Sequence, residues 1–384
     1  MTAHRTGLVV AGAGARGAYE AGALSELVPW MASTGPRPSV FVGTSAGALN
    51  VVALAGLTHL TPVEAVTQLT ETWSAVRLHD VFGLASGIDT GARYLGQLTG
   101  VRTRLPSLLD TERLRGRLSE WLPLDTLHRN VDDGLVAAVA VTTTSVATGG
   151  TVVFVEKHPS VPLPPPDTGR DITYVETRLT VDHVLASAAV PLLFRPVQVR
   201  EPERWTGWYV DGGLRLNAPL SPAIAFGCDR LGVVATQPMT RTVSPPPRAR
   251  GRTHGEPAGD GVQPDVYAVG ALAMRVLLAD RMIEDLHRLA GAPDPVDIVF
   301  AGPPADRRGD IAALADDAFR TRYGTFGMAR NPSMWMLSRL IGGDPDDHGN
   351  LLSYLFFDPA FTRRAARLGR RHARHLLGTS TGDG

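Results

Sequence analysis

The chain has 384 residues, of which 43% are hydrophobic, and 38 lysines and arginines balance 38 aspartates and glutamates. This composition excludes global disorder, and the zero net charge removes the whole-molecule electrostatic case for nucleic-acid binding. The single cysteine, Cys228, excludes an internal disulfide and any metal site built from several cysteines. We find no apolar run of about 18 residues and no basic leader before a cleavage site, so we expect a cytoplasmic protein.

The beginning of the chain alternates short apolar runs with glycine turns and helical patterns. Gly7–Ala11 and Ser39–Val42 are predicted to be buried strands, and Ala18–Trp30 and Ala46–Leu57 are predicted to be helices. Strand, turn and helix in this order predict the opening of a parallel α/β sheet.

The next segments continue this pattern with less regularity. Residues 61–130 are mostly helical in character. Further strands and one helix are expected at Leu135–Thr143, Thr151–Glu156, Leu179–Ala189 (the helix), Trp208–Val210 and Arg230–Ala235. We expect the last of these to be the final strand of the sheet.

Composition divides the chain into three parts. We expect a catalytic domain over residues 1–235, a loop rich in proline, glycine and arginine over 236–265, and a helical region over 266–384 that packs on the catalytic domain. In the last part, Val266–Ala290 and the arginine-rich Pro359–Leu377 are predicted to be helices. The basic helix is either a solvated face or a contact with an anionic membrane surface.

The first glycine turn follows the first predicted strand and matches the pattern G-x-G-x-x-G. Its residues are Gly12, Ala13, Gly14, Ala15, Arg16 and Gly17. A dinucleotide-binding turn would need an acidic residue at the end of the second strand, and that strand ends in Gly43-Thr44-Ser45 instead. Dinucleotide binding therefore stays a minor alternative, and an anion site made of backbone amides is favoured. Arg16 is expected either to steer a phosphate head group or to cap the turn and pair with a surface acid.

The second glycine turn contains a serine in the pattern G-x-S-x-G. It reads Gly43-Thr44-Ser45-Ala46-Gly47 and lies between a predicted strand and a predicted helix. Small residues allow a sharp turn there, which pushes the serine hydroxyl out at the sheet edge. We therefore predict that Ser45 is a nucleophile.

A nucleophilic serine needs a base, and the histidines are poorly placed to provide one. His183 and His287 lie within predicted helices, and none follows the end of a strand. Asp211 does follow a predicted strand and opens the turn Asp211-Gly212-Gly213. Burial in apolar surroundings would raise the pKa of this carboxyl and make it a usable base.

The two glycine turns, the turn Asp211-Gly212-Gly213 and the segment Ala186–Pro191 together resemble the patatin-like phospholipase family. The resemblance covers about residues 7–235 and implies a three-layer α/β/α sandwich with a mainly parallel central sheet, to which C-terminal helices are added. It also implies hydrolysis of lipid acyl esters by a serine–aspartate dyad, without a metal or other cofactor.

Carried over to this sequence, the resemblance makes Ser45 the nucleophile and Asp211 its base, with the amides of the first glycine turn as the oxyanion hole. Gly43 and Gly47 would shape the elbow, and Gly212 and Gly213 would support the base. A Ser–Asp–His esterase and an acyltransferase remain alternatives. Peripheral membrane contact and the oligomeric state stay open.

Overall fold

The computed structural model describes residues 5–77, 81, 112–191, 193–239, 296–323 and 345–380. Its strands are β1 (Arg5–Val10), β2 (Val40–Thr44), β3 (Ala138–Ser145), β4 (Thr151–Lys157), β5 (Ile172–Glu176), β6 (Val197–Val199), β7 (Gly207–Asp211), β8 (Cys228–Val234) and β9 (Asp297–Ala301). Its α-helices are α1 (Gly17–Thr34), α2 (Ala46–Gly56), α3 (Pro62–Ala75), α6 (Glu112–Trp121), α7 (Leu124–Asp132), α8 (Val181–Ser187), α9 (Leu220–Ala225), α12 (Asp310–Tyr323), α15 (Pro345–Leu355) and α16 (Pro359–Ser380). Short 3-10 turns lie at η1 (Gly14–Arg16), η2 (Glu203–Trp205), η3 (Gly212–Leu214) and η4 (Ala305–Arg307).

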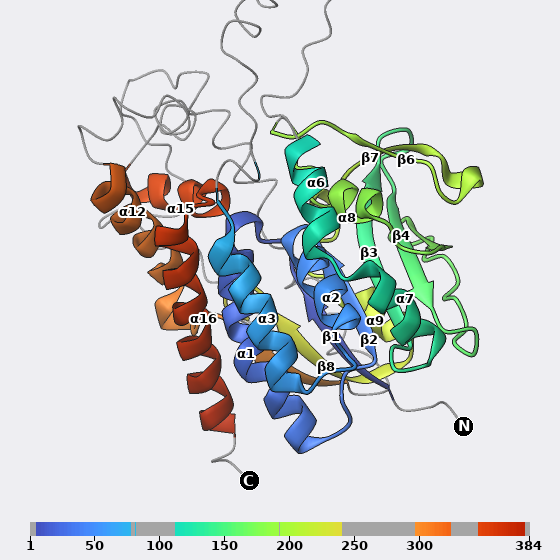
Figure 1. Cartoon of the computed structure of the whole chain (residues 1–384), viewed down its shortest axis with the longest axis horizontal. Coiled ribbons are helices and arrows are strands. Elements are labelled where there is room, and N and C mark those ends of the chain that lie inside the picture. Colours follow the sequence, from blue (N-terminus) through green and yellow to red (C-terminus); the bar gives the residue numbers. More distant parts are fainter. Residues whose placement is uncertain are drawn as a thin grey trace, which may run out of the picture.

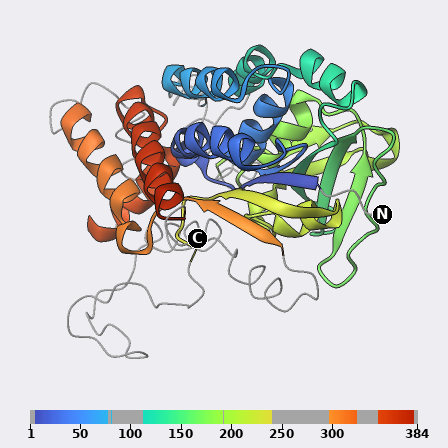
Figure 2. The same cartoon turned by 90° about the horizontal axis from the view of Figure 1, so that it is seen from below.

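The strands form one mainly parallel sheet in the order β5-β4-β3-β2-β1-β8-β9, with β7 and β6 attached beside β3. The β3–β4 pair is antiparallel, whereas β1, β2, β3, β8 and β9 run parallel to one another. Figures 1 and 2 show helices on both sides of this sheet and the C-terminal helices beside α1. The predicted α/β fold with C-terminal helices is confirmed.

The two faces of the sheet bury alternate residues, as a period of two requires. Leu8 and Val10 of β1 join the core under α1, α2 and α8, whereas Val9 and Ala11 join the core on the face that α9 covers. All four side chains are buried. The continuous apolar runs that predicted buried strands therefore reflect a sheet that is covered on both faces.

The expectation that Arg230–Ala235 would be the last strand is wrong. β8 occupies these residues, but β9 pairs with it in parallel, from Arg230 opposite Asp297 to Val234 opposite Ala301. Residues 1–235 therefore do not contain the whole sheet. The loop predicted over 236–265 and the helix predicted over Val266–Ala290 lie almost entirely outside the described residues.

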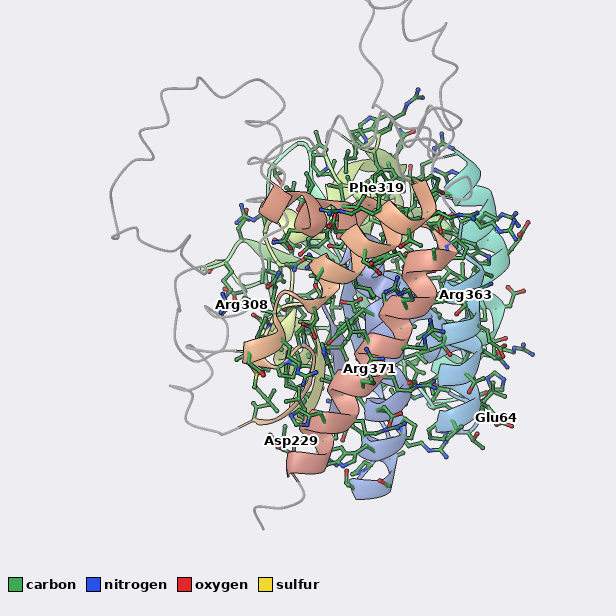
Figure 3. All side chains as sticks on the ribbon, turned by 90° about the vertical axis from the view of Figure 1, so that its left-hand side faces the viewer. Glu64, Asp229, Arg308, Phe319, Arg363 and Arg371 are labelled. Carbon is green, nitrogen blue, oxygen red and sulfur yellow. The ribbon has the colours of Figure 1, made fainter. Side chains whose placement is uncertain are left out.

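The predicted basic C-terminal helix is confirmed as α16, which lies along α1 (Figure 1). Several of its arginines face outward, Arg363 and Arg371 among them (Figure 3). Others form ion pairs with acidic side chains, such as Arg364 with Asp317 and Arg374 with Glu26. No helix in the described ranges is long and apolar enough to cross a membrane.

The packing of α16 on α1 depends on glycine. A Cβ at Gly22 would overlap the Ala366 carbonyl oxygen, and a Cβ at Gly369 would overlap the Tyr19 carbonyl oxygen. We expect Gly22→Ala to lower the free energy of unfolding by roughly 2 kcal/mol, because the helices must separate. Gly116 lies on an exposed face of α6, and a Cβ there would have nothing within 4 Å. Gly116→Ala should therefore raise the free energy of unfolding by about 0.5–1 kcal/mol. Denaturant titration of both variants checks the prediction, and equal effects of one sign would contradict it.

Candidate active site

Ser45 lies at a strained turn between β2 and α2. Its backbone has φ 55° and ψ −126°, a conformation that a residue with a side chain rarely adopts. A Cβ at Gly43 would lie 2.5 Å from the Gly47 carbonyl oxygen, and a Cβ at Gly47 would overlap carbonyl oxygens of the β1 end. Gly43 and Gly47 are therefore required because backbone segments cross in contact here, as the pattern G-x-S-x-G predicted.

Strand β3 brings Ser45 and Asp211 together. Thr44, the last residue of β2, pairs with Thr142, and Asp211, the last residue of β7, pairs with Thr143. Strand β7 pairs with β3 directly beyond the point where β2 ends. Ser45, which follows β2, and Asp211, which ends β7, therefore lie at neighbouring positions along β3. The two residues are 166 positions apart in the sequence, and only the sheet register unites them.

The Asp211 carboxyl is buried, with 4% of the residue exposed. Its Oδ1 accepts the Gly213 N–H at 2.7 Å, and its Oδ2 has no hydrogen-bond partner among the described residues. Burial raises the pKa of Asp211 to about 7, although the Ser45 hydroxyl and the Gly213 N–H each lower it. The carboxyl is thus near Ser45 with one oxygen unused, although no completed hydrogen bond joins the two side chains in this state. Such bonds often tighten only when substrate is bound.

Ser187 holds the backbone of the elbow. Its hydroxyl accepts the Ser45 N–H at 2.9 Å and donates to the Thr142 carbonyl at 2.6 Å. The Asp211 N–H in turn donates to the Ala189 carbonyl, two residues beyond Ser187. The small-residue block Ala186–Pro191 therefore supports both candidate catalytic residues.

The first glycine turn faces Ser45, but only some of its amides are available. The Gly12 N–H donates to the Asn217 carbonyl, the Arg16 N–H to the Ala13 carbonyl, and the Gly17 N–H to the carbonyls of η1. The amides of Ala13 and Gly14 have no acceptor in the described chain and border the same pocket as Ser45. The turn lies close to the serine, since a Cβ at Gly12 would be 3.2 Å from the Ser45 Cβ.

A mostly apolar pocket of about 210 Å³ opens over these residues. Leu49, Ala53 and Leu57 line it from α2 at intervals of four residues after Ser45, so they share one face of that helix. The other walls are apolar side chains of α3, α6, the segment after α8, and the end of α15: Leu69, Trp73, Leu114, Leu118, Val190, Leu193, Phe194, Leu355 and Phe357. The pocket therefore suits an extended apolar group whose reactive end lies at Ser45.

Comparison with known proteins identifies the family of the chain. The model of the family described as Patatin-like phospholipase matches residues 8–224 of the chain. The chain belongs to this family. Its members are lipid hydrolases and esterases, so the chain is an enzyme of that class. No curated protein matches the sequence at a significant level.

The crystal structure of VipD from Legionella pneumophila is similar at 14% sequence identity and a TM-score of 0.33, and the match covers 98% of this chain and 67% of that chain.

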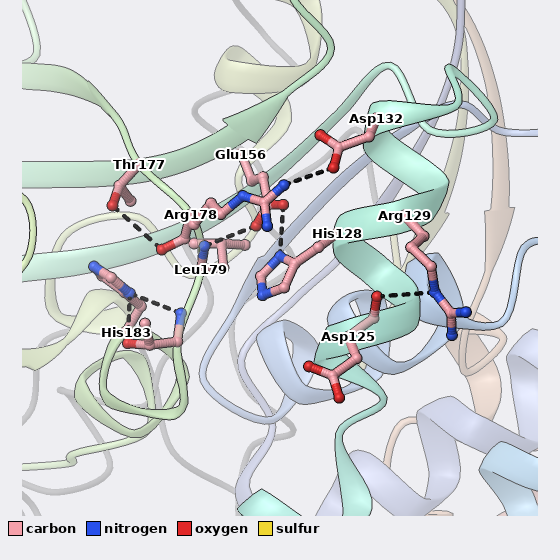
Figure 4. A network of polar contacts seen from close by, with 10 residues as sticks. Asp125, His128, Arg129, Asp132, Glu156, Thr177, Arg178, Leu179 and His183 are labelled. Atoms are coloured by element: carbon pink, nitrogen blue, oxygen red, sulfur yellow. Dashed lines mark hydrogen bonds and ion pairs between the residues drawn. The ribbon is translucent and has the colours of Figure 1, made fainter.

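Several described histidines of the patatin-like chain bond to groups outside the candidate site. Figure 4 shows His128 bound to Glu156 at 2.7 Å and His183 bound to the backbone near Leu179. Burial lowers the pKa of His183 to about 4. None of the histidines in the described ranges borders the pocket, and His4, His79, His254, His287 and His348 are not among the described side chains. No described cluster of His, Cys, Asp and Glu could hold a metal ion.

Sequence reasoning missed three contributors to the site. Ser187 lies in the segment Ala186–Pro191, but the sequence predicts no role for it. Asn217 belongs to no motif, and the residues of α15 lie far along the chain from both glycine turns. Arg16 was expected to face a head group or to pair with an acid. Instead, its guanidinium is buried against neutral oxygens of α15, at 2% exposure of the residue.

Proposed function

We propose that the chain is a serine lipid acyl hydrolase of phospholipase A or lysophospholipase type, in which Ser45 is the nucleophile and Asp211 is the base. The observation that carries the proposal is the convergence of a strained serine and a buried carboxyl of raised pKa at one end of an apolar pocket. Membership of a lipid hydrolase family supports it.

In the first step, Asp211 takes the proton of the Ser45 hydroxyl as the serine oxygen attacks the ester carbonyl carbon. The carbonyl oxygen becomes an oxyanion, which the Ala13 and Gly14 amides stabilise, and each such donor is worth about 3 kcal/mol of barrier. The tetrahedral intermediate expels the alcohol, which takes the proton from Asp211. An acyl-enzyme on Ser45 remains.

In the second step, Asp211 takes a proton from water as the water oxygen attacks the acyl carbon. The same amides stabilise the second oxyanion. Collapse of this tetrahedral intermediate releases the fatty acid, and the proton moves from Asp211 to the Ser45 oxygen. An alcohol in place of water would make the reaction an acyl transfer through the same groups.

The pH dependence follows from the protonation state of the base. Asp211 must be ionised to accept a proton, and burial raises its pKa to about 7. We therefore expect kcat/KM for a soluble ester to rise as the pH rises through about 7 and to level off above it. A pH–rate profile of the free enzyme between about pH 5 and about pH 9 checks this, and a flat profile would contradict an aspartate base of raised pKa.

Hydrolysis of a series of p-nitrophenyl esters tests the function itself. Laurate should be hydrolysed with a higher kcat/KM than acetate, because only the longer acyl chain fills the pocket along α2. Ala53 lies eight residues after Ser45, about 12 Å along the helix. Ala53→Trp should therefore lower kcat/KM for laurate at least about tenfold and change it for acetate less than about threefold.

Acetate hydrolysis is the internal control for folding in this experiment. Equal losses for both esters, or no preference for the longer chain in the wild type, would show that the pocket does not hold the acyl group. Phospholipids and neutral glycerides tested next would identify the head group that the enzyme accepts.

A further inference from the structure

Arg16 lies in the candidate oxyanion turn, and its guanidinium is buried. The hydrogen bonds of this guanidinium all go to α15, a helix that lies beyond the matched residues 8–224. Its Nε donates to the Ser353 hydroxyl at 2.8 Å, and its Nη2 donates to the Asn350 side-chain oxygen at 2.6 Å and to the Asn350 carbonyl at 3.2 Å. Asn350 and Ser353 belong to α15, more than 330 positions along the chain. Among the described residues no carboxylate contacts this guanidinium.

Tyr354 contacts the same turn at two points. The Arg16 guanidinium carbon lies 3.9 Å from the centre of the Tyr354 ring, and Nη1 donates to the Tyr354 hydroxyl at 3.2 Å. At the other end of η1, Gly14 has φ 55°, and a Cβ there would overlap the Tyr354 carbonyl oxygen. Helix α15 therefore contacts both ends of the three-residue turn that begins at Gly14.

The position of this turn matters because its Ala13 and Gly14 amides, which have no acceptor among the described residues, border the same pocket as Ser45. A hydrogen-bond donor must lie about 3 Å from the developing oxyanion, and a displacement of 1 Å can cost about 100-fold in rate. The Arg16 and Gly17 amides donate to carbonyls within the turn, so these hydrogen bonds join the turn only to itself. The planar, five-donor guanidinium supplies support from outside the turn by reaching three residues of α15 at once.

We infer that Arg16 is a positioning residue: with Asn350, Ser353 and Tyr354 it holds the Ala13 and Gly14 amides opposite Ser45. This inference rests on the proposed function of those amides. It makes α15 a working part of the active site, although α15 lies beyond residues 8–224. It also removes Arg16 from contact with the substrate.

Two sets of variants of the full chain test the inference. Arg16→Lys keeps the charge but replaces the planar fork by a single ammonium group. Asn350→Ala with Ser353→Ala leaves Arg16 in place and removes the two shortest of its acceptors. Each should lower kcat for p-nitrophenyl laurate about 10- to 100-fold with KM changed less than about threefold, because the acyl pocket is untouched. The triple variant should be no slower than Arg16→Lys alone, because all three changes break one linkage.

Tyr323→Phe is the matched control. It removes the hydrogen bond from the Tyr323 hydroxyl to Asp358, which joins α12 to the start of α16 in the same C-terminal region without touching Arg16. This variant should keep the wild-type kcat. All rates are measured well below the melting temperature of each variant, so that unfolding does not contribute.

Amide hydrogen exchange gives a readout that does not depend on hydrolysis. In peptides covering residues 11–18, exchange should be several-fold faster in Arg16→Lys and in the α15 double variant than in the wild type or Tyr323→Phe. Unchanged kcat and unchanged exchange in the two variants would overturn the inference, as would multiplicative losses in the triple variant. If the wild type lacks hydrolysis that depends on Ser45, the proposed function fails, and the exchange experiment still decides whether α15 holds the turn.

Discussion

Asp211→Asn is expected to abolish hydrolysis while it makes the protein more stable at alkaline pH. The asparagine oxygen can still accept the Gly213 N–H, so the turn is kept, but the amide cannot take a proton from Ser45. Loss of a general base lowers the rate about 100- to 10,000-fold. Hydrolysis of a p-nitrophenyl ester by purified Asp211→Asn measures this directly.

The stability gain follows from the raised pKa of the buried carboxyl. The folded protein binds this proton more tightly than the unfolded chain, since the pKa of Asp211 rises from 3.8 to about 7 on folding. The wild-type free energy of unfolding therefore falls as the pH rises from about 4 to about 7 and is constant above that. At about 1.4 kcal/mol for each pKa unit, the loss is at most about 4 kcal/mol, and Asp211→Asn avoids it.

Denaturant titrations at about pH 4 and about pH 8 check the prediction. Asp211→Asn should match the wild type at the lower pH and exceed its stability at the higher pH. Asp133→Asn makes the same change at an exposed position, the C-terminal cap of α7, and is the matched control. An active Asp211→Asn enzyme, or one that is less stable at both values of pH, would contradict the assigned base.

Removal of the nucleophile is expected to have the largest effect on activity. Ser45→Ala and Ser45→Gly both lack the attacking oxygen and should lower kcat at least about 10,000-fold, since loss of a catalytic serine leaves only the oxyanion donors and substrate binding. The two variants should differ in stability. Glycine accepts the backbone conformation at φ 55° without strain, whereas alanine keeps the strain.

We therefore expect Ser45→Gly to have a free energy of unfolding about 1 kcal/mol higher than Ser45→Ala. Thermal or denaturant unfolding of the two inactive proteins gives this difference without interference from catalysis. Equal stability would mean that the elbow is not strained in solution, and measurable hydrolysis by either variant would assign the nucleophile to another residue.

The central part of the fold was predictable because its signals are local. Each predicted strand at the start of the chain is a short apolar run. Each turn contains glycines because backbone segments cross closely there, as Gly47 does against the end of β1. Strands β5, β6 and β9 were not predicted. β6 has only three residues, and β9 is added to the sheet by pairing with β8, more than 60 positions earlier in the chain.

The candidate site was predictable only where its signals are local in the sequence. Ser45 and Asp211 were predicted as site residues because each lies where a strand runs into a small-residue turn, but their proximity depends on the register of β3 with both β2 and β7. The hydrogen bonds that join Ser187 to Ser45, Asn217 to Gly12 and Arg16 to Ser353 each span 142 positions or more along the chain. No local pattern encodes such partners. The Gly12 amide has such a distant acceptor in the Asn217 carbonyl, whereas the Arg16 and Gly17 amides donate to carbonyls within their own turn.

The most direct test of the account is the mass of the intact protein after reaction with a fluorophosphonate. This reagent phosphonylates a serine hydroxyl only where a base and an oxyanion site activate it. We predict a single adduct on the wild type, its absence on Ser45→Ala, and slow formation on Asp211→Asn. An unlabelled wild type, or an adduct that persists in Ser45→Ala, would contradict a catalytic role for Ser45.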